Sequence, residues 1–327
     1  MSRRPAHVTS GPYAPPVPRT TRTVTSADGA RLYAEMHGPE SAPAVVLAHG
    51  WTCSTAFWAP VVRELATDHK VVVYDQRGHG RSPAAGPAGH STHALADDLV
   101  AVLEATLETG ERAVLGGHSM GGMTIMAAAE RPQLRERAAA ALLCSTGSAD
   151  LPAESRVFPL RSPRGRRRAH RLMLRSRAPL GPVSPLTRRA LKYATMGPAA
   201  TAEQIEACAR IVHGCPTAVR ARWGTVLDGL ELTGGAARLE LPTAVLTGTA
   251  DRLTPPVQAR RLASVLPDFR GLTELPGLGH MTPIEDPGAV SGRLRALVQD
   301  HLRSTGTTGA VTAEVPHGTR QKTEKTV

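Results

Sequence analysis

Short runs of consecutive apolar residues alternate with longer segments of helical periodicity along most of the chain. A continuous apolar run suits a strand that is buried on both faces, as the strands of a parallel sheet are. Such runs predict strands at residues 44–48 and 71–74, and further strands are predicted at residues 113–117, 140–144, 243–247 and 271–275. Helical spacing predicts helices at residues 58–67, 94–108, 120–130, 256–266 and 287–302. The alternation predicts an α/β fold with a doubly wound, mostly parallel sheet.

The alternation is interrupted between residues 148 and 235. This stretch contains no convincing strand and has helix-like segments near residues 164–177, 187–195, 202–212 and 217–230. We therefore expect a helical cap, inserted into an α/β core that consists of residues 21–147 and 236–303. Residues 1–20 and 304–327 are rich in Pro, Thr, Ser and Gly without apolar periodicity, so we expect disordered tails there.

Positive charge is concentrated in the predicted cap. The chain carries 39 Lys and Arg against 28 Asp and Glu, a formal net charge of +11. Residues 155–192 contain no acid and twelve cations, namely Arg156, Arg161, Arg164, Arg166, Arg167, Arg168, Arg171, Arg175, Arg177, Arg188, Arg189 and Lys192. Without these twelve, 27 basic groups face 28 acidic groups, so the excess charge belongs to this one segment.

Length and cysteine content narrow the class of protein. A chain of 327 residues can bury a large core, which excludes a peptide hormone or a disulfide miniprotein. The longest apolar run, residues 138–144, is far shorter than the roughly 20 residues that cross a bilayer. Cys53, Cys144, Cys208 and Cys215 are expected to be free thiols, with a Cys208–Cys215 disulfide as the alternative. No apolar signal segment follows the first arginines, so we expect a cytoplasmic protein, with peripheral membrane association as a second possibility.

The segment Gly117-His118-Ser119-Met120-Gly121 carries the most specific chemical signal. It follows a predicted strand and precedes a predicted helix, the context that distinguishes a nucleophile elbow from a chance G-x-S-x-G match. In so tight a turn, side chains two residues before and after the serine would collide with the neighbouring backbone, so both positions are glycine. The pattern predicts that Ser119 is exposed as a nucleophile at the start of a helix.

A serine hydroxyl needs a base to attack a carbonyl at neutral pH, and the base needs an acid that orients it. Asp251 follows the predicted strand 243–247, and His280 follows the predicted strand 271–275. Because the carboxyl ends of parallel strands meet at one edge of the sheet, we predict that Ser119, Asp251 and His280 form a catalytic triad. Asp150, just after the strand at 140–144, is the competing acid.

Acyl transfer also requires donors for the developing oxyanion. By position, these are the backbone N–H groups of Met120, directly after the serine, and of Trp51, in the loop after the strand at 44–48. Trp51, Phe57 and Trp58 are predicted to form the substrate-binding wall, although Phe57 and Trp58 could equally anchor a helix in the core. His49, beside this loop, is interpreted as a structural histidine.

These residues together resemble the α/β-hydrolase superfamily, in its esterase, lipase and perhydrolase-like branch. The resemblance covers about residues 22–303 and rests on His49-Gly50-Trp51, Gly117 to Gly121, Asp251, Gly279-His280 and the segment from Asp75 to Ser82. The last looks like the D-x-R-G-H-G-x-S turn of this branch, which we interpret as structural. Epoxide hydrolases and haloalkane dehalogenases attack with an aspartate at the elbow, so Ser119 argues against both.

The resemblance implies a serine hydrolase that needs no cofactor and no metal. We expect it to cleave a carboxylic ester or thioester, such as a lipid or monoacylglycerol-type ester, through an acyl-enzyme on Ser119. General-base catalysis by His280 predicts that activity falls in mildly acidic buffer. Perhydrolase or carbon–carbon bond hydrolase chemistry is the alternative, and a ligand receptor on the same fold is the alternative outside enzymes.

The expected partner is a small-molecule ester with an apolar acyl group or ring. The arginine-rich cap is open to three interpretations, namely a solvated helical face, a surface that rests on an anionic membrane, and a site for acidic ligands. Nucleic acid is disfavoured as a partner, because the basic run contains Phe158 alone among residues that could stack on bases.

Overall fold

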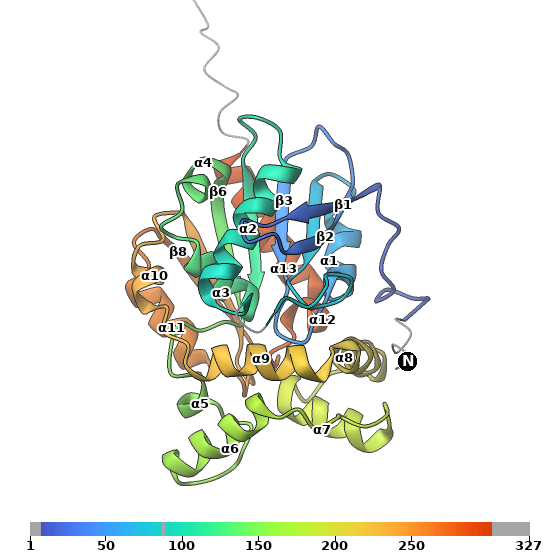
Figure 1. Cartoon of the computed structure of the whole chain (residues 1–327), viewed down its shortest axis with the longest axis vertical. Helices are drawn as coiled ribbons and strands as arrows, with labels where there is room; N and C mark the ends of the chain where they lie inside the picture. Colours follow the sequence, from blue (N-terminus) through green and yellow to red (C-terminus); the bar gives the residue numbers. More distant parts are fainter. Residues whose placement is uncertain (1–7, 87–88, 303–327) are drawn as a thin grey trace, which may run out of the picture.

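The computed structural model describes residues 8–86 and 89–302, and within them one eight-stranded sheet has the order β1-β2-β4-β3-β5-β6-β7-β8 (Figure 1). The strands are β1 (Thr20–Thr25), β2 (Arg31–His37), β3 (Ala44–Ala48), β4 (Lys70–Asp75), β5 (Ala113–His118), β6 (Ala138–Cys144), β7 (Thr243–Gly248) and β8 (Phe269–Leu275). β2 pairs in antiparallel orientation with both β1 and β4, and β3 to β8 are parallel to one another. The predicted doubly wound, mostly parallel sheet is confirmed.

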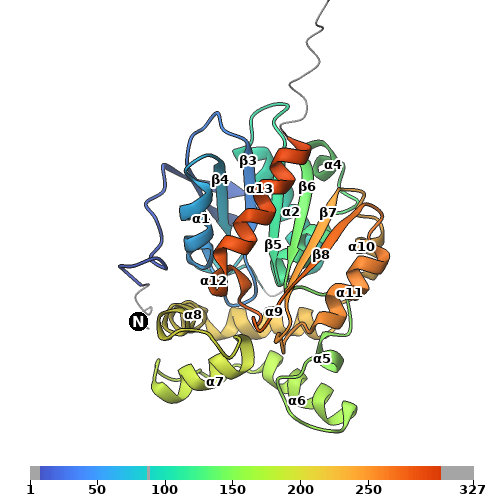
Figure 2. The same cartoon turned by 180° about the vertical axis from the view of Figure 1, so that it is seen from behind.

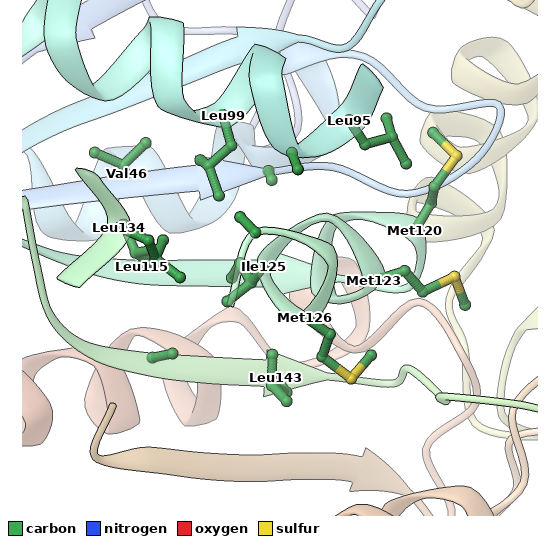
Figure 3. Close-up of a cluster of buried hydrophobic side chains, with 14 of the residues drawn as sticks. Val46, Leu95, Leu99, Leu115, Met120, Met123, Ile125, Met126, Leu134 and Leu143 are labelled. Carbon is green, nitrogen blue, oxygen red and sulfur yellow. The ribbon is translucent and has the colours of Figure 1, made fainter. Parts of the chain in front are cut away.

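The sheet is covered on both faces, because successive side chains of its strands point to opposite sides. In β3, Val46 belongs to one apolar cluster, whereas Val45 and Leu47 belong to the other. α1 (Ala59–Leu65) and α13 (Pro287–His301) pack on the second face, and α2 (Thr92–Thr106), α3 (Met120–Ala127) and α11 (Pro256–Val265) pack on the first (Figure 2). Figure 3 shows side chains of α2 and α3 meeting those of the strands in the first cluster. Every residue of β3 to β7 is therefore buried.

The two antiparallel strands were not specified by the apolar pattern. β1 is mostly polar and lies at an edge of the sheet, where each of its residues except Val24 is exposed. Short helices complete the described core, namely the 3₁₀ helix η1 (Thr55–Trp58), α4 (Pro132–Arg137), α10 (Thr233–Ala237) and α12 (Thr282–Glu285).

The predicted tails differ from the structure at the N-terminal side. Of the expected tail at residues 1–20, residues 8–20 are described and pack against the core. Ala14 is buried and its carbonyl oxygen accepts a hydrogen bond from Arg63 Nη2 at 2.9 Å, while Tyr13 packs against the second apolar cluster. The ordered chain thus begins before the predicted boundary at residue 21. Residues 1–7 and the predicted tail 304–327 lie outside the described residues.

Six helices of the described chain lie between β6 and β7, and the five that precede α10 lie across one end of the sheet, with α6 and α7 outermost (Figures 1 and 2). They are α5 (Leu151–Glu154), α6 (Pro163–Arg175), α7 (Pro185–Thr195), α8 (Ala202–Gly214) and α9 (Thr217–Asp228). Side-chain caps from Ser162, Ser184 and Thr201 define where α6, α7 and α8 begin. α6 packs closely on α9, where a Cβ on Gly224 would lie 1.9 Å from the Leu174 carbonyl oxygen.

We refer to residues 148–235 as the cap segment. Within the described residues, no helix is both long and apolar enough to cross a membrane. Cys53, Cys144, Cys208 and Cys215 are buried free thiols.

Candidate active site

Ser119 occupies a strained turn between β5 and α3. Its φ of 51° and ψ of −115° are unfavourable for a residue with a side chain, and such strain tends to occur at functional sites. A Cβ on Gly117 would lie 2.6 Å from the Gly121 carbonyl carbon, and a Cβ on Gly121 would lie 2.0 Å from the Ala48 carbonyl oxygen. The two glycines are therefore required sterically, as the motif predicts. Thr146 Oγ1 donates to the Ser119 carbonyl oxygen at 2.7 Å and holds the turn to the end of β6.

His280 and Asp251 lie side by side in loops that follow β8 and β7. His280 Nδ1–H donates to Asp251 Oδ2 at 2.8 Å, and both side chains are at least 95% buried. The other oxygen, Asp251 Oδ1, accepts the backbone N–H groups of Leu253 and Thr254 at 2.8 and 2.9 Å. A carboxylate beside Nδ1 requires the proton there, so Nε2 of the neutral ring is left as the basic nitrogen.

Thr254 completes this hydrogen-bond network and was not identified from the sequence. Its Oγ1 lies 2.8 Å from Asp251 Oδ2, 3.1 Å from His280 Nδ1 and 2.9 Å from the Ser145 carbonyl oxygen. The spacing Asp251-x-x-Thr254 is that of a capping turn, in which a carboxylate accepts nearby backbone N–H groups, and this spacing could have revealed it.

Glu285 anchors the His280 loop to the cap segment and was also missed. Its carboxylate accepts the backbone N–H groups of Gly279, Met281 and Gly197, at 2.7 to 3.1 Å. Burial raises the pKa of this carboxyl group. In addition, the carbonyl oxygen of Thr195, at the end of α7, accepts a hydrogen bond from the backbone N–H of His280 at 2.8 Å. The sequence carries no signal for the contacts of Glu285 and Thr195, because they depend on how the cap segment packs against the His280 loop.

The predicted oxyanion donors flank the serine. Met120 is the first residue of α3 and is fully buried. Trp51 lies in the loop after β3, and its indole Nε1–H donates to the Arg220 carbonyl of α9 at 3.0 Å. A Cβ on Gly50 would lie 3.1 Å from Ser119 Cβ, so this loop passes directly against the serine turn.

Ser119, His280 and Trp51 line one cavity of about 480 Å³ between the sheet and the cap segment. Apolar side chains form most of its wall, namely Met123, Leu151, Met173, Leu174, Leu180, Leu191, Val212, Leu227, Leu253 and Met281. The cap also contributes His170, His213 and Arg220. A mostly apolar cavity with a few convergent polar groups is the usual form of a small-molecule site.

A family model described as the alpha/beta hydrolase family matches residues 45–293. The chain belongs to the alpha/beta hydrolase family. It is 30% identical over 276 residues to a protein named putative carbamate hydrolase RutD from Pseudomonas syringae pv. syringae, covering 82% of this chain and 98% of that protein. The family match and this relative support hydrolase activity for the protein.

Solved structures of esterases share the architecture of this alpha/beta hydrolase. A thermophilic esterase from Thermogutta terrifontis has a TM-score of 0.70 at 26% identity, covering 86% of this chain and 98% of that one. The esterase RhEst1 from a Rhodococcus species has a TM-score of 0.71 at 23% identity, covering 86% and 99%, and shows the fold alone.

Phe57 and Trp58 are placed differently from the sequence expectation. In this alpha/beta hydrolase they are 1% and 0% exposed within the second apolar cluster, and neither lines the cavity. η1 turns both rings inward, where they make an edge-to-face pair with centroids 5.6 Å apart. Phe57 instead supports the site from behind, because its ring lies 4.5 Å from that of His118. Phe57 and Trp58 therefore fit the alternative expectation, in which they anchor a helix in the core.

Asp150 does not approach His280 through any hydrogen bond among the described residues. Its exposed carboxylate lies 3.4 Å from Arg167 Nη2, at the start of α5. Asp251 is the carboxylate that contacts the imidazole of this alpha/beta hydrolase. Among the residues that the structure describes, no cluster of His, Cys, Asp or Glu has the form of a metal site.

Structural roles account for the other polar residues of the family resemblance. His49 Nδ1–H donates to the Gly50 carbonyl, its Nε2 accepts the Gln76 N–H, and burial lowers its pKa to about 3. In the turn from Asp75 to Ser82, Arg77 donates to Asp98 Oδ2 at 2.6 Å, and Asp75 accepts the Thr55 N–H at 2.7 Å. The loops beside Ser119 are held in place by these buried polar contacts.

Proposed function

We propose that this hydrolase cleaves carboxylic esters or thioesters through an acyl-enzyme on Ser119. The observation that carries the proposal is the 2.8 Å contact of His280 with Asp251, beside the strained Ser119 turn and along the same cavity. Nucleophile, base and orienting acid in this arrangement are the elements of acyl transfer by a serine.

In the first half of the reaction, His280 Nε2 accepts the proton of Ser119 Oγ while the oxygen attacks the ester carbonyl. The backbone N–H groups of Trp51 and Met120 hold the negative oxygen of the tetrahedral intermediate. His280 then returns the proton to the departing alcohol or thiol, and the acyl group remains on Ser119.

In the second half, His280 takes a proton from water as the water oxygen attacks the acyl carbonyl. The bond from the acyl carbon to Ser119 Oγ then breaks, His280 returns the proton to that oxygen, and the acid leaves. Asp251 stabilises the imidazolium that forms in each half and fixes the ring tautomer. Because Asp251 accepts hydrogen bonds from Leu253, Thr254 and His280, its charge is compensated despite its burial.

The composition of the cavity wall supports an apolar acyl group or ring as the part of the substrate next to Ser119. Trp51 offers a flat aromatic surface there, and Met123, Met173 and Met281 offer adaptable ones. The cavity volume of about 480 Å³ lies within the usual range for small-molecule sites.

Hydrolysis of p-nitrophenyl esters with acyl chains from two to twelve carbons tests the proposal. Wild-type protein should turn over at least part of the series many times, and Ser119→Ala should lower kcat by about 10⁴-fold or more. A wild-type protein that binds these esters without turnover would favour a receptor, and activity retained by Ser119→Ala would contradict the acyl-enzyme.

A second property, docking on an anionic membrane, is proposed for the outer face of the cap segment. Four large apolar side chains of this segment are more than 40% exposed and do not line the cavity, namely Leu160, Leu172, Leu186 and Tyr193. They lie among the cap arginines on and around α6 and α7, the outermost helices in Figures 1 and 2. Exposed leucines within a basic surface fit the headgroup region of an anionic bilayer.

Sedimentation with vesicles tests the docking face. The protein should bind phosphatidylserine-containing vesicles better than pure phosphatidylcholine vesicles, and added salt should weaken the binding. Leu172→Gln with Leu186→Gln should reduce binding several-fold. Val257→Gln, which changes an equally apolar exposed side chain on α11, is the matched control. Equal binding to both kinds of vesicle would overturn this proposal.

A further inference from the structure

The cavity beside Ser119 contains a single permanent charge among the described residues that line it, and this charge is positive. Arg220 of α9 supplies it, and no Asp, Glu or Lys side chain lines the same cavity. The remaining basic groups along the wall are histidines, namely His118, His170, His213 and His280. Burial lowers the pKa of His170 to about 4, so this ring is neutral at pH 7.

The Arg220 side chain has no acidic partner among the described residues, although the residue is 5% exposed. Its Nη2 donates to the carbonyl oxygens of Ser176 and Ala178, and its Nε and Nη1 have no hydrogen-bond partner in the described chain. Burial of an unpaired charge is unfavourable unless a group of opposite charge is supplied. Arg220 is therefore a cation at the cavity wall that lacks a counter-ion among the described residues.

Arg77 is a buried arginine with a structural role, and its partners differ from those of Arg220. It is 1% exposed and forms ion pairs with Asp98 at 2.5 Å and Asp28 at 2.7 Å. Although burial acts against it, hydrogen bonds to both acids raise the pKa of Arg77, whereas burial lowers the pKa of Arg220. The contrast indicates that the partner of Arg220 comes from outside the described chain.

The position of Arg220 relates it to the proposed reaction. Its backbone carbonyl accepts the Trp51 indole N–H at 3.0 Å, and the Trp51 loop passes against Ser119. An anion at Arg220 thus occupies the same cavity as an ester carbonyl at Ser119. The cations of the cap segment also produce a positive field around the cavity, which favours the approach of anions.

We propose that Arg220 binds a carboxylate of the substrate, so that the preferred substrates are esters that carry a second, free carboxylate group. Half-esters of dicarboxylic acids belong to this class. The ester part of the proposal rests on the proposed function, whereas the carboxylate site can be tested without turnover. A carboxylate would supply the opposite charge and accept hydrogen bonds from Nε or Nη1.

The kinetic test uses p-nitrophenyl monoesters of adipic, pimelic and suberic acid and their methyl-capped neutral counterparts. Wild-type protein should have the higher kcat/KM for the acid of each pair, with an optimum at one chain length. Arg220→Gln should lower the ratio of acid to neutral kcat/KM by about 10- to 100-fold, the loss expected for a charged hydrogen bond. Arg220→Lys should retain part of the ratio.

Arg222→Gln is the matched control, because Arg222 lies on the same helix, does not line the cavity and donates to the Ala85 carbonyl. It should leave the ratio unchanged. If Arg220→Gln lowers both kcat/KM values equally, Arg220 acts only by holding the Ser176–Ala178 loop, and the proposal fails. A wild-type preference for the neutral ester would likewise overturn it while leaving the serine hydrolase intact.

Direct binding separates this proposal from the proposed function. Titration calorimetry of Ser119→Ala with adipate should show binding that Arg220→Gln in the same background weakens by about 10-fold or more. Dimethyl adipate should show no such dependence on Arg220. Adipate that binds both proteins equally, or neither of them, contradicts the carboxylate site whatever the outcome of the ester assays.

Discussion

The chemistry of the site depends on a few buried hydrogen bonds around Asp251. Its two oxygens together accept two backbone N–H groups, the Thr254 hydroxyl and the His280 imidazole. The Ser145 carbonyl oxygen lies 2.9 Å from Thr254 Oγ1 and is a second acceptor for its one proton, so Thr254 links the network to the end of β6. In the proposed mechanism Thr254 is a positioning residue, since it acts through Asp251 and His280.

Thr254→Val tests this role at nearly constant side-chain volume. The variant should lower kcat for an ester about 10-fold, because one hydrogen bond that orients Asp251 and His280 is lost, and KM should change little. Thr247→Val is the matched control, since the Thr247 hydroxyl is buried and has no hydrogen-bond partner among the described residues. It should leave kcat unchanged and keep or raise the thermal midpoint. Steady-state kinetics and thermal unfolding of both variants decide the question.

The residues of this network differ in how far the sequence predicts them. Ser119 and Asp251 follow strands with apolar runs, whereas His280 follows β8, whose residues are of mixed polarity. The order of the strands along the chain nevertheless places all three residues at one edge of the sheet. Phe57 and Trp58 were predicted less well, because apolar aromatic residues carry no signal that separates a cavity wall from the core. Glu285 and Arg220 depend on contacts between the cap segment and the core, which sequence spacing does not encode.

At the level of the secondary-structure elements, β5, α3 and β3 approach one another so closely at the serine turn that only glycine fits between them. Gly117 and Gly121 lie where a Cβ would meet the backbone of neighbouring elements. The G-x-S-x-G pattern predicted this contact because its cause is local and steric. β1 and β2 escaped prediction because an edge pair of mixed polarity has no continuous apolar run.

Gly121→Ala should lower the free energy of unfolding by about 3 kcal/mol or more, because the added methyl would lie 2.0 Å from the Ala48 carbonyl oxygen. Gly292→Ala on α13 is the matched control, since a Cβ there would have no described atom within 4 Å apart from its chain neighbours and its own helix backbone. That substitution should stabilise the protein by up to about 1 kcal/mol through helix propensity. Urea unfolding measures both, and equal effects would contradict the account of the turn.

At the scale of the whole molecule, the cap segment and the core share the site and its buried titratable groups. α7 is bound to the His280 loop through Thr195 and Glu285, and α9 is bound to the Trp51 loop through Arg220. His49 and His79 in the core and His170 in the cap are buried, and burial lowers their pKa values to about 3, 4 and 4. The folded protein therefore keeps all three rings neutral at pH values where an unfolded chain binds protons.

Acid should destabilise the fold for this reason. Below the ordinary histidine pKa of about 6.5, the unfolded chain takes up protons that the folded chain does not, and each ring contributes up to about 1.4 kcal/mol per pH unit. The stabilisation is complete above this pH and is lost as pH falls toward 4. Asp75 opposes the trend in part, because burial raises its pKa to about 6 and favours proton uptake by the folded state.

Urea unfolding between pH 7 and pH 4.5 measures this dependence. The free energy of unfolding should fall with pH, and His170→Gln should make the dependence shallower. A free energy of unfolding that is equal at pH 7 and pH 5 would contradict the role of the buried histidines.

Intact mass spectrometry during turnover tests whether an acyl group is transferred to Ser119. Protein mixed with a p-nitrophenyl ester and quenched within the first turnovers should gain the mass of one acyl group, with peptide mapping to Ser119. p-Nitrophenol should be released in a burst that matches the amount of protein. Ser119→Ala should show neither. Turnover without a covalent intermediate in the wild type, or an acyl group on another residue, would contradict the account.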